Sequence, residues 1–529
     1  MTLSFRKMKG YFRFLLSLYG YFKHTMTLAE AKTRIRERMA LRESRFLSLL
    51  EKGVFSVSSN PFCVLLKAAD ISLSDIKQMV AARGLEGALE ELRDRGVYLT
   101  LEEFKGERSV LRFNQSFVFR EEDFDNPYLG ASLETVSGAS RSSGTRTLFD
   151  TDFLTEWACY DALLFDMYDI YSMPLSIWLP GMPAYAGIRG LLSYTKIGKN
   201  VDHWFLMHDK SGLQDVNKIN DRFMRYVLKV KEWSGRGKTT LGYAPLSRIS
   251  DVLHWVVSNL GKYGKCAVFS YVSNAVRLCL QARRENVSIQ GVIFIIGSEP
   301  LTTTKQKIIE DAGCIVAPRY VVTEFGPLAY ACKEARGVDR MHLLQDSIAV
   351  IQGSSDVDAF EGKTDGVLFA TNLLPTASKF LVNVETGDRG ILSNSDCQCP
   401  WHRLGFALTV CQVTSYKKIT VNGVTFSVSD IVDSVERLLI KTLCIDPVDF
   451  QLTEQEVEGV TQIVLFISPS VEVSDEKISS LVLDEIASIN SRYKFLVSIL
   501  RDGNIWKIVR KQPRLTARGK LLHFAMYPA

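Results

Sequence analysis

A stretch rich in serine, glycine and arginine at residues 137–147 has the composition of a phosphate-binding loop. Backbone N–H groups of small residues can surround a phosphate, while hydroxyl and guanidinium groups add further donors. The candidate phosphate ligands are Ser137, Gly138, Ser140, Ser143, Gly144 and Thr145. Taken alone, the same composition fits an ordinary flexible connection equally well.

A second glycine-rich segment, Gly235-Arg-Gly-Lys-Thr239, ends like the phosphate-binding loop of P-loop NTPases. That motif requires a glycine five residues before Gly237, and the residue there is Glu232. The segment that precedes it, residues 223–233, has the pattern of a helix rather than of the required strand. We therefore exclude a P-loop NTPase.

Four further segments follow the serine-rich loop in a characteristic order. They are Gly297-Ser-Glu-Pro300, Tyr320-Val-Val-Thr-Glu-Phe-Gly326, Glu385-Thr-Gly-Asp388 and Pro513-Arg-Leu-Thr-Ala-Arg-Gly-Lys520. The series resembles the adenylate-forming superfamily of acyl-CoA ligases and adenylation domains, specifically its phenylacetate-CoA ligase-like branch. The resemblance covers roughly residues 130 to 520.

The resemblance implies a nucleotide site. The 137–147 loop would wrap the phosphates of ATP, Glu299 would join the ATP contacts, and Tyr320 would stack on the adenine. Asp388 would hold the ribose, since a carboxylate can accept hydrogen bonds from both ribose hydroxyls.

The resemblance also implies the reacting groups. Thr323 would contact the α-phosphate, and Glu324 would hold Mg²⁺, which prefers a carboxylate together with phosphate oxygens and waters. Lys520 would be the catalytic residue, because an ammonium group can neutralise the charge that builds up in the displacement at the α-phosphate.

Two positions depart from the pattern of the superfamily. Val321 stands where a glycine is usual, and Thr414-Ser-Tyr-Lys417 stands where an Arg-x-Asp-Asp run is usual. The hinge between the two expected domains would fall at Tyr416 or Lys417. These departures keep open a second hypothesis, a catalytically degenerate member that acts as a binding or scaffold protein.

Trp178 and Tyr271 fall where the superfamily builds its acyl pocket. The resemblance thus implies an aromatic or bulky acid, with ordinary core packing as the alternative.

Two cysteines, Cys397 and Cys399, are separated by one residue and have His402 and Cys411 nearby. Such groups can bind Zn²⁺, but the spacing matches no standard zinc knuckle. We expect reduced core cysteines here rather than a structural Zn²⁺ at Cys397 and Cys399.

The elements that must position these groups are those of an α/β protein. Helical segments at 249–260 and 273–285 alternate with short apolar runs at 291–296 and 366–371, which is typical of buried strands. The pattern predicts a helical prefix at residues 1–129, an ATP- and acid-binding adenylation core at 130–413, and a small, mobile α+β domain at 414–529.

Composition adds constraints on partners and location. A net charge of +5 over 529 residues, with no dense basic run, argues against nucleic-acid binding. Ten scattered cysteines favour reduced thiols in a cytoplasmic protein. No segment offers the roughly 20 apolar residues of a transmembrane helix, and the N-terminal stretch 1–23 is typical of a helix in weak peripheral contact with a membrane.

The sequence thus predicts ATP-dependent activation of a small carboxylic acid to an acyl-adenylate, with release of pyrophosphate. Transfer to a thiol of CoA or of the phosphopantetheine on an acyl carrier protein would follow. An amide-forming variant of the same chemistry stays open.

Overall fold

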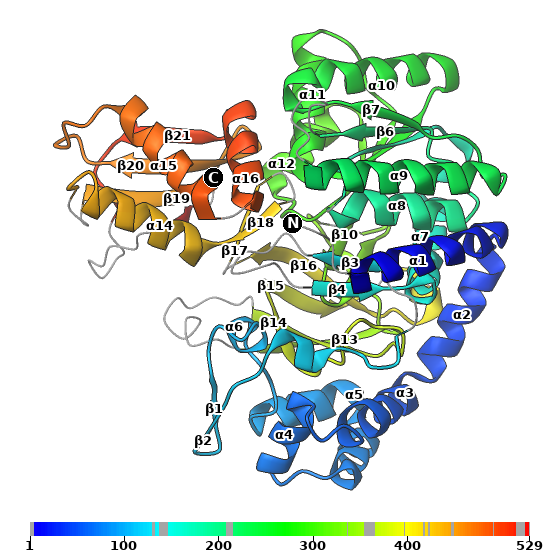
Figure 1. The fold of residues 1–529 in the computed structure, drawn as a ribbon. Coiled ribbons are helices and arrows are strands. Elements are labelled where there is room, and N and C mark those ends of the chain that lie inside the picture. Colours follow the sequence, from blue (N-terminus) through cyan, green and yellow to red (C-terminus); the bar gives the residue numbers. More distant parts are fainter. Residues whose placement is uncertain are drawn as a thin grey trace.

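The structure, a computed structural model, describes thirteen ranges of the chain. They are residues 5–129, 133–136, 146–182, 184–207, 215–335, 337–353, 366–395, 397–415, 418–421, 424–445, 449–489, 491–514 and 524–527. Figure 1 shows a large α/β body with a smaller unit, formed by the last part of the chain, beside it.

A twelve-stranded sheet with the order β13-β14-β15-β16-β12-β11-β10-β9-β8-β5-β6-β7 forms the centre of the large body. One half is parallel and consists of β5 (Leu175–Trp178), β6 (His203–Leu206), β7 (Thr240–Tyr243), β8 (Cys266–Tyr271), β9 (Val292–Gly297) and β10 (Ile315–Val322). The other half is antiparallel and consists of β11 (Gly326–Ala331), β12 (Met341–Leu343), β13 (Ile348–Gly353), β14 (Gly366–Asn372), β15 (Val384–Asn394) and β16 (Leu408–Ser415).

The central strands are apolar because helices cover both of their faces. Every residue of β8 is buried, as are the first five of β9, as expected for parallel strands in a covered sheet. The helices are α7 (Thr151–Met167), α8 (Tyr185–Lys196), α9 (Asp215–Trp233), α10 (Ile249–Tyr263), α11 (Val272–Arg284) and α12 (Thr303–Asp311). The predicted helices at 249–260 and 273–285 and the predicted strands at 291–296 and 366–371 are confirmed within a few residues.

The first 129 residues are mainly helical, and they pack into the core of the large body. The helices are α1 (Phe5–Lys23), α2 (Leu28–Ala40), α3 (Arg42–Leu49), α4 (Pro61–Ala68), α5 (Leu73–Asp94) and α6 (Leu101–Phe104), followed by a hairpin of β1 (Val110–Arg112) and β2 (Gln115–Phe117). One cluster of buried residues runs from Phe14 to Val410.

Helix α1 uses its apolar face inside the protein. Phe14, Leu18 and Phe22 are fully buried, and the ring of Phe14 meets that of Phe149 edge-on at 5.8 Å. Leu16 and Tyr19 on the same helix are exposed. None of the described helices is long and apolar enough to cross a membrane.

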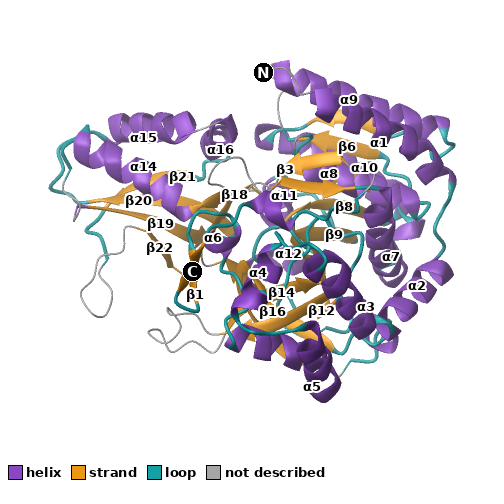
Figure 2. Cartoon of the chain, turned by 60° about the horizontal axis from the view of Figure 1, so that its bottom comes forward, coloured by secondary structure: helices purple, strands orange, loops and turns teal. Residues whose placement is uncertain are grey.

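The last part of the chain builds a smaller sheet with its own core. A hairpin of β17 (Lys418–Val421) and β18 (Val424–Ser427) leads into it. The sheet has the order β21-β20-β19-β22 and consists of β19 (Phe450–Val457), β20 (Val460–Ile467), β21 (Trp506–Arg510) and β22 (Phe524–Tyr527). Figure 2 shows α14 (Val428–Lys441), α15 (Asp475–Ile489) and α16 (Ser491–Asp502) together on one side of it.

A second cluster of buried residues, from Ile431 to Trp506, holds this smaller unit together. The unit touches the large body through polar and apolar contacts. Thr302 donates to Glu456, the Lys305 ammonium donates to the Thr461 hydroxyl at 3.0 Å, Leu246 packs against the smaller core, and Val460 packs against the large one. The predicted boundary near residue 414 and the mobility of the smaller unit stay predictions.

Candidate active site

The parallel half of the sheet brings several predicted residues to one edge. Trp178 ends β5, Tyr271 ends β8, Glu299 follows β9, and the Thr323-Glu324 turn follows β10. Because these strands are parallel neighbours, their carboxyl ends meet at the same edge, where ligands of open α/β sheets bind. This edge is the candidate active site.

The turn after β10 holds Thr323 and Glu324 in a fixed place. The backbone N–H of Phe325 donates to the carbonyl of Val322 at 3.1 Å, which closes the turn, and Glu324 is 7% exposed. Gly326 follows with φ of 89°, and a Cβ there would lie 2.8 Å from the Phe153 ring. Only glycine fits both the backbone angle and this close approach.

Tyr320 and Asp388 are in direct contact. The phenol of Tyr320 donates to one carboxylate oxygen of Asp388 at 2.9 Å, and the hydroxyl of Ser415 donates to the other. The Thr386 hydroxyl accepts a hydrogen bond from the Asp388 backbone N–H at 3.2 Å. Asp388 is thus held from three sides, while its two oxygens retain further lone pairs for a ligand.

This contact requires a strongly curved sheet. Strands β10 and β15 are four positions apart in the sheet, or about 19 Å if it were flat. The β15–β16 ladder therefore bends back toward β10. The pairing of β10 with β11 shifts at Tyr320, and that of β15 with β16 shifts after Arg389, as in β-bulges that re-aim side chains.

Burial keeps Tyr320 a neutral donor. It raises the pKa of this phenol well above its ordinary value, and the neighbouring Asp388 carboxylate raises it further. The Tyr320 hydroxyl therefore holds its proton at neutral pH and orients Asp388.

Glu299 has a structural task as well as its predicted one. Its carboxylate accepts hydrogen bonds from the backbone N–H of Ser273 at 2.6 Å and from the Ser273 hydroxyl at 2.9 Å. Ser273 lies in the first turn of α11, so the carboxylate caps that helix. Its contact with ATP stays a prediction.

The two acyl-pocket candidates differ in their surroundings. Trp178 is fully buried, and its indole N–H donates to the Ala244 carbonyl at 2.9 Å, as expected for a core residue. Tyr271 is 4% exposed, and burial raises its pKa above the ordinary value. Neither observation tests an acyl-binding role.

Several predicted residues lie outside the part of the chain that the structure describes: the loop residues Ser137, Gly138, Ser140, Ser143, Gly144 and Thr145, the hinge candidates Tyr416 and Lys417, and the catalytic candidate Lys520. The described neighbours place the loop between β3 (Leu133–Val136) and β4 (Arg146–Phe149), which pair antiparallel with Val136 opposite Arg146. Residue 520 falls in the connection between β21 and β22.

The segment resembling a P-loop is not followed by a helix that starts at its lysine. It comes after α9, in the turn that leads to β7. This placement also argues against a P-loop NTPase.

The sequence did not single out Ser415 and Thr386 as site residues. Both lie within or beside predicted motifs. Thr386 contacts the Asp388 backbone from two residues away on β15, and Ser415 reaches the Asp388 side chain because β15 and β16 pair with these two residues opposite each other.

The chain has the fold of the adenylate-forming enzymes. It is similar to the solved structure of 2-hydroxyisobutyryl-CoA ligase in complex with 2-HIB-AMP and CoA in the thioesterification state. The TM-score is 0.54 at 13% identity, covering 96% of this chain and 91% of that one. The predicted α/β adenylation fold is confirmed, and the superfamily resemblance holds for the fold, whereas the phenylacetate-CoA ligase-like branch stays a prediction.

Two more distant structures are also similar. One is the amide bond synthetase McbA from Marinactinospora thermotolerans, with a TM-score of 0.41 at 12% identity over 74% of this chain and 67% of that one. The other is the Vibrio cholerae adenylation domain AlmE, with 0.38 at 12% identity over 73% and 64%. No family model and no curated protein sequence matches the chain.

Proposed function

We propose that the protein activates a carboxylic acid with ATP, forming an acyl-adenylate and pyrophosphate, and passes the acyl group to a thiol of CoA or a carrier protein. The observation that carries the proposal is the hydrogen-bonded group of Tyr320, Asp388 and Ser415 beside the Thr323-Glu324 turn. A carboxylate that is fixed by hydrogen bonds and still has unused lone pairs can accept hydrogen bonds from both hydroxyls of a ribose.

The described residues suit the nucleotide in its magnesium form. Mg²⁺ takes one or two protein carboxylates and fills its remaining positions with phosphate oxygens and waters, so Glu324 alone on a closed turn is a sufficient protein ligand. When bound, the ion would neutralise charge on the phosphates. Thr323, next to it, would donate to an oxygen of the α-phosphate.

The acid carboxylate would approach the α-phosphate at the carboxyl edge of the parallel strands. Its oxygen forms a bond to the α-phosphorus while the bond to the β-phosphate bridging oxygen breaks, and pyrophosphate leaves. Lys520 would neutralise the developing charge in this step, and the serine-rich loop would hold the leaving group.

ATP–pyrophosphate exchange measured across a panel of carboxylic acids tests the proposal. We expect exchange with at least one acid, dependent on Mg²⁺. Glu324→Gln should abolish it because the amide keeps the shape and removes the charge, while Glu476→Gln on the exposed face of α15 should leave it unchanged.

Binding of ATP without exchange for any acid would instead support the degenerate, binding-protein hypothesis. Wild-type exchange in Glu324→Gln would remove Glu324 from the site.

A further inference from the structure

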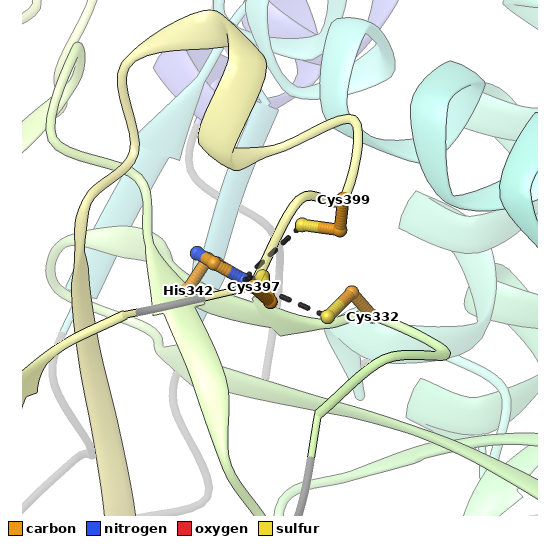
Figure 3. A group of neighbouring side chains, drawn as sticks. All are labelled: Cys332, His342, Cys397 and Cys399. Carbon is orange, nitrogen blue, oxygen red and sulfur yellow. Dashed lines mark hydrogen bonds between the residues drawn. The ribbon is translucent and has the colours of Figure 1, made fainter.

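Four soft ligands from distant parts of the chain converge at one point. Figure 3 shows Cys332, His342, Cys397 and Cys399 pointing toward a common centre. The three Sγ atoms and one His342 ring nitrogen all lie within 4.8 Å of one another. Cys332, His342 and Cys399 are at most 4% exposed, and Cys397 is half-buried.

The separations are those of a tetrahedral metal site. With Zn–S near 2.3 Å and Zn–N near 2.0 Å, a tetrahedron places sulfur and nitrogen about 3.5 Å apart. Nε2 of His342 lies 3.1 Å from Cys397 Sγ, 3.3 Å from Cys399 Sγ and 3.6 Å from Cys332 Sγ. These three distances bracket the ideal value.

The histidine is already in the tautomer that binds metal. Its Nδ1 lies 2.8 Å from the Phe406 carbonyl oxygen, which can only accept, so Nδ1 carries the hydrogen. In the neutral ring, Nε2 then presents its lone pair to the three sulfurs. A backbone carbonyl in this position is the usual outer partner of a metal-bound histidine.

Hydrogen bonds also reach the sulfurs. The Ser395 hydroxyl donates to Cys397 Sγ at 3.2 Å, and the backbone N–H of His402 donates to Cys399 Sγ at 3.5 Å. Such donors stabilise thiolates, the form of cysteine that binds metals.

We propose that Cys332, His342, Cys397 and Cys399 form a structural Zn²⁺ site. Sulfur and imidazole ligands in a tetrahedron favour zinc among the common divalent ions. Four protein ligands leave no open position, so the ion would be structural rather than catalytic. Binding releases the protons of those cysteines that are still thiols, and the three thiolates and the imidazole then hold the ion.

The site joins three segments that are far apart in the sequence and lie on neighbouring strands of the sheet. Cys332 directly follows β11, His342 is the middle residue of the three-residue strand β12, and Cys397 and Cys399 lie between β15 and β16. The indole of Trp401 also reaches this region, donating to the Ala331 carbonyl at 3.1 Å. A metal here would fix the centre of the antiparallel half of the sheet.

The ligand set differs from the residues that the sequence suggested. Cys411 lies on β16, His402 begins the short helix His402–Leu404 that precedes β16, and neither belongs to the converging group. The expectation of reduced cysteines without zinc rested on the spacing of Cys397, Cys399, His402 and Cys411, which is not the spacing of the group that the fold assembles.

The test is the metal content of the full chain, purified without chelators and analysed by plasma mass spectrometry. We expect about one zinc per chain. Cys399→Ala should lower this at least about tenfold, whereas Cys411→Ala, a matched buried cysteine on β16, should keep it. Absence of zinc even after incubation with Zn²⁺, iron in its place, or retention of zinc by Cys399→Ala would overturn the proposal.

Two further measurements keep the test decisive if Cys399→Ala does not fold. Replacing the ion by Co²⁺ in the wild-type chain should give the intense visible bands of tetrahedral cobalt with sulfur-to-metal charge transfer; weak octahedral bands would contradict the site. Ser395→Ala, which keeps all four ligands, should weaken zinc affinity about tenfold or more in competition with a chelator.

Thiol titration in denaturant with chelator separates zinc from a disulfide. All ten cysteines are free in the structure, and we expect ten titratable thiols. A count of eight, with the disulfide mapped by peptide mass spectrometry to two cysteines of the group, would contradict the metal site.

Discussion

The two ends of strand β11 carry two different kinds of polar site. Before its first residue, Gly326, lies the Thr323-Glu324 turn with Tyr320 and Asp388 beside it; after its last, Ala331, lies the cysteine and histidine group. At the first end the polar atoms are held but keep lone pairs for a ligand. At the second end all four ligand atoms point at one another. The first suits a substrate that comes and goes, the second an ion that stays.

The mixed sheet explains how the two ends of β11 can lie at two separate polar sites. In the parallel half all carboxyl ends meet at one edge, whereas β11 runs back against β10 and starts at that edge. Its six residues span about 20 Å, so its carboxyl end lies at the opposite edge. The comparison predicts that changes at one end affect nucleotide chemistry and changes at the other affect stability.

The largest effect on the nucleotide end should come from Lys520→Ala. A charge-stabilising donor in a water-poor site is typically worth about 10²–10³ in rate, so adenylate formation should fall by about that factor. Transfer from a pre-formed acyl-adenylate should change much less. Pyrophosphate release and thioester formation, followed separately, measure the two steps.

Lys494→Ala, on the exposed face of α16, is the control for Lys520→Ala. Equal losses in both half-reactions would assign Lys520 to folding or general ligand binding.

A smaller effect is expected for Asp388→Asn. The amide keeps the size of the side chain but cannot accept from Tyr320, Ser415 and a ribose diol together, and hydrogen bonds to a charged group contribute about 1.5–3 kcal/mol. The KM for ATP should therefore rise about 10–100-fold. Initial rates of exchange at varied ATP give this value.

Asp339→Asn is the matched control. Asp339 is also a buried carboxylate with two hydrogen bonds, from the backbone N–H groups of Gln412 and Val413, but it lies two residues before β12, whose first residue pairs with Ala331 at the end of β11. Its variant should leave the KM for ATP within about twofold. A rise equal to that of Asp388→Asn would mean that the two ends are not independent.

The two ends also differ in how far the sequence predicted them. The residues beside the Thr323-Glu324 turn could be chosen from the sequence because they lie in short motifs, such as 320–326 and 385–388, whose order along the chain is characteristic, and their roles toward a nucleotide stay predictions. Apolar runs and helical periods predicted the α/β class and, within a few residues, the bounds of α10, α11, β9 and β14. The contact between Tyr320 and Asp388 was not predictable, since it depends on bulges and on the bend of the β15–β16 ladder.

Only the Cys397-x-Cys399 pair gave a local signal of the cysteine and histidine group, and nothing near it in the sequence indicated the other two members. Cys332 and His342 are separated by nine residues, and Cys397 lies 55 residues after His342. Only strand order brings them together, because β12 lies between β11 and β16. The nearby His402 and Cys411 had the closer spacing in sequence and were the wrong partners for Cys397 and Cys399.

Tyr320→Phe should have a modest effect. The ring remains for stacking on adenine, but the hydroxyl that donates to Asp388 is lost. Asp388 keeps its charge and its bond from Ser415, so only part of the roughly 1.5–3 kcal/mol of a hydrogen bond to a charged group should be lost from ATP binding, and the KM for ATP should rise about 3–10-fold. The same exchange assay measures it, and a rise as large as that of Asp388→Asn would show that Tyr320 does more than orient the carboxylate.

The smallest effect is a pH dependence of stability from Asp339. Burial raises its pKa to about 6, against the two backbone N–H donors, from Gln412 and Val413, that lower it. Since the folded chain binds this proton more tightly than the unfolded chain, the contribution to stability is fully present below the unfolded pKa of about 4 and is lost as pH rises through about 6. The loss is at most about 3 kcal/mol, which shifts the Tm of a chain this long by only about 3 °C.

Asp339→Asn cannot titrate, so the difference in Tm between the wild type and this variant should change across that window, while contributions of other groups with raised pKa values, such as Glu454, cancel. A constant difference would show that Asp339 is ionised throughout. The stability of this end of β11 would then depend on its packing and on the group of Cys332, His342, Cys397 and Cys399.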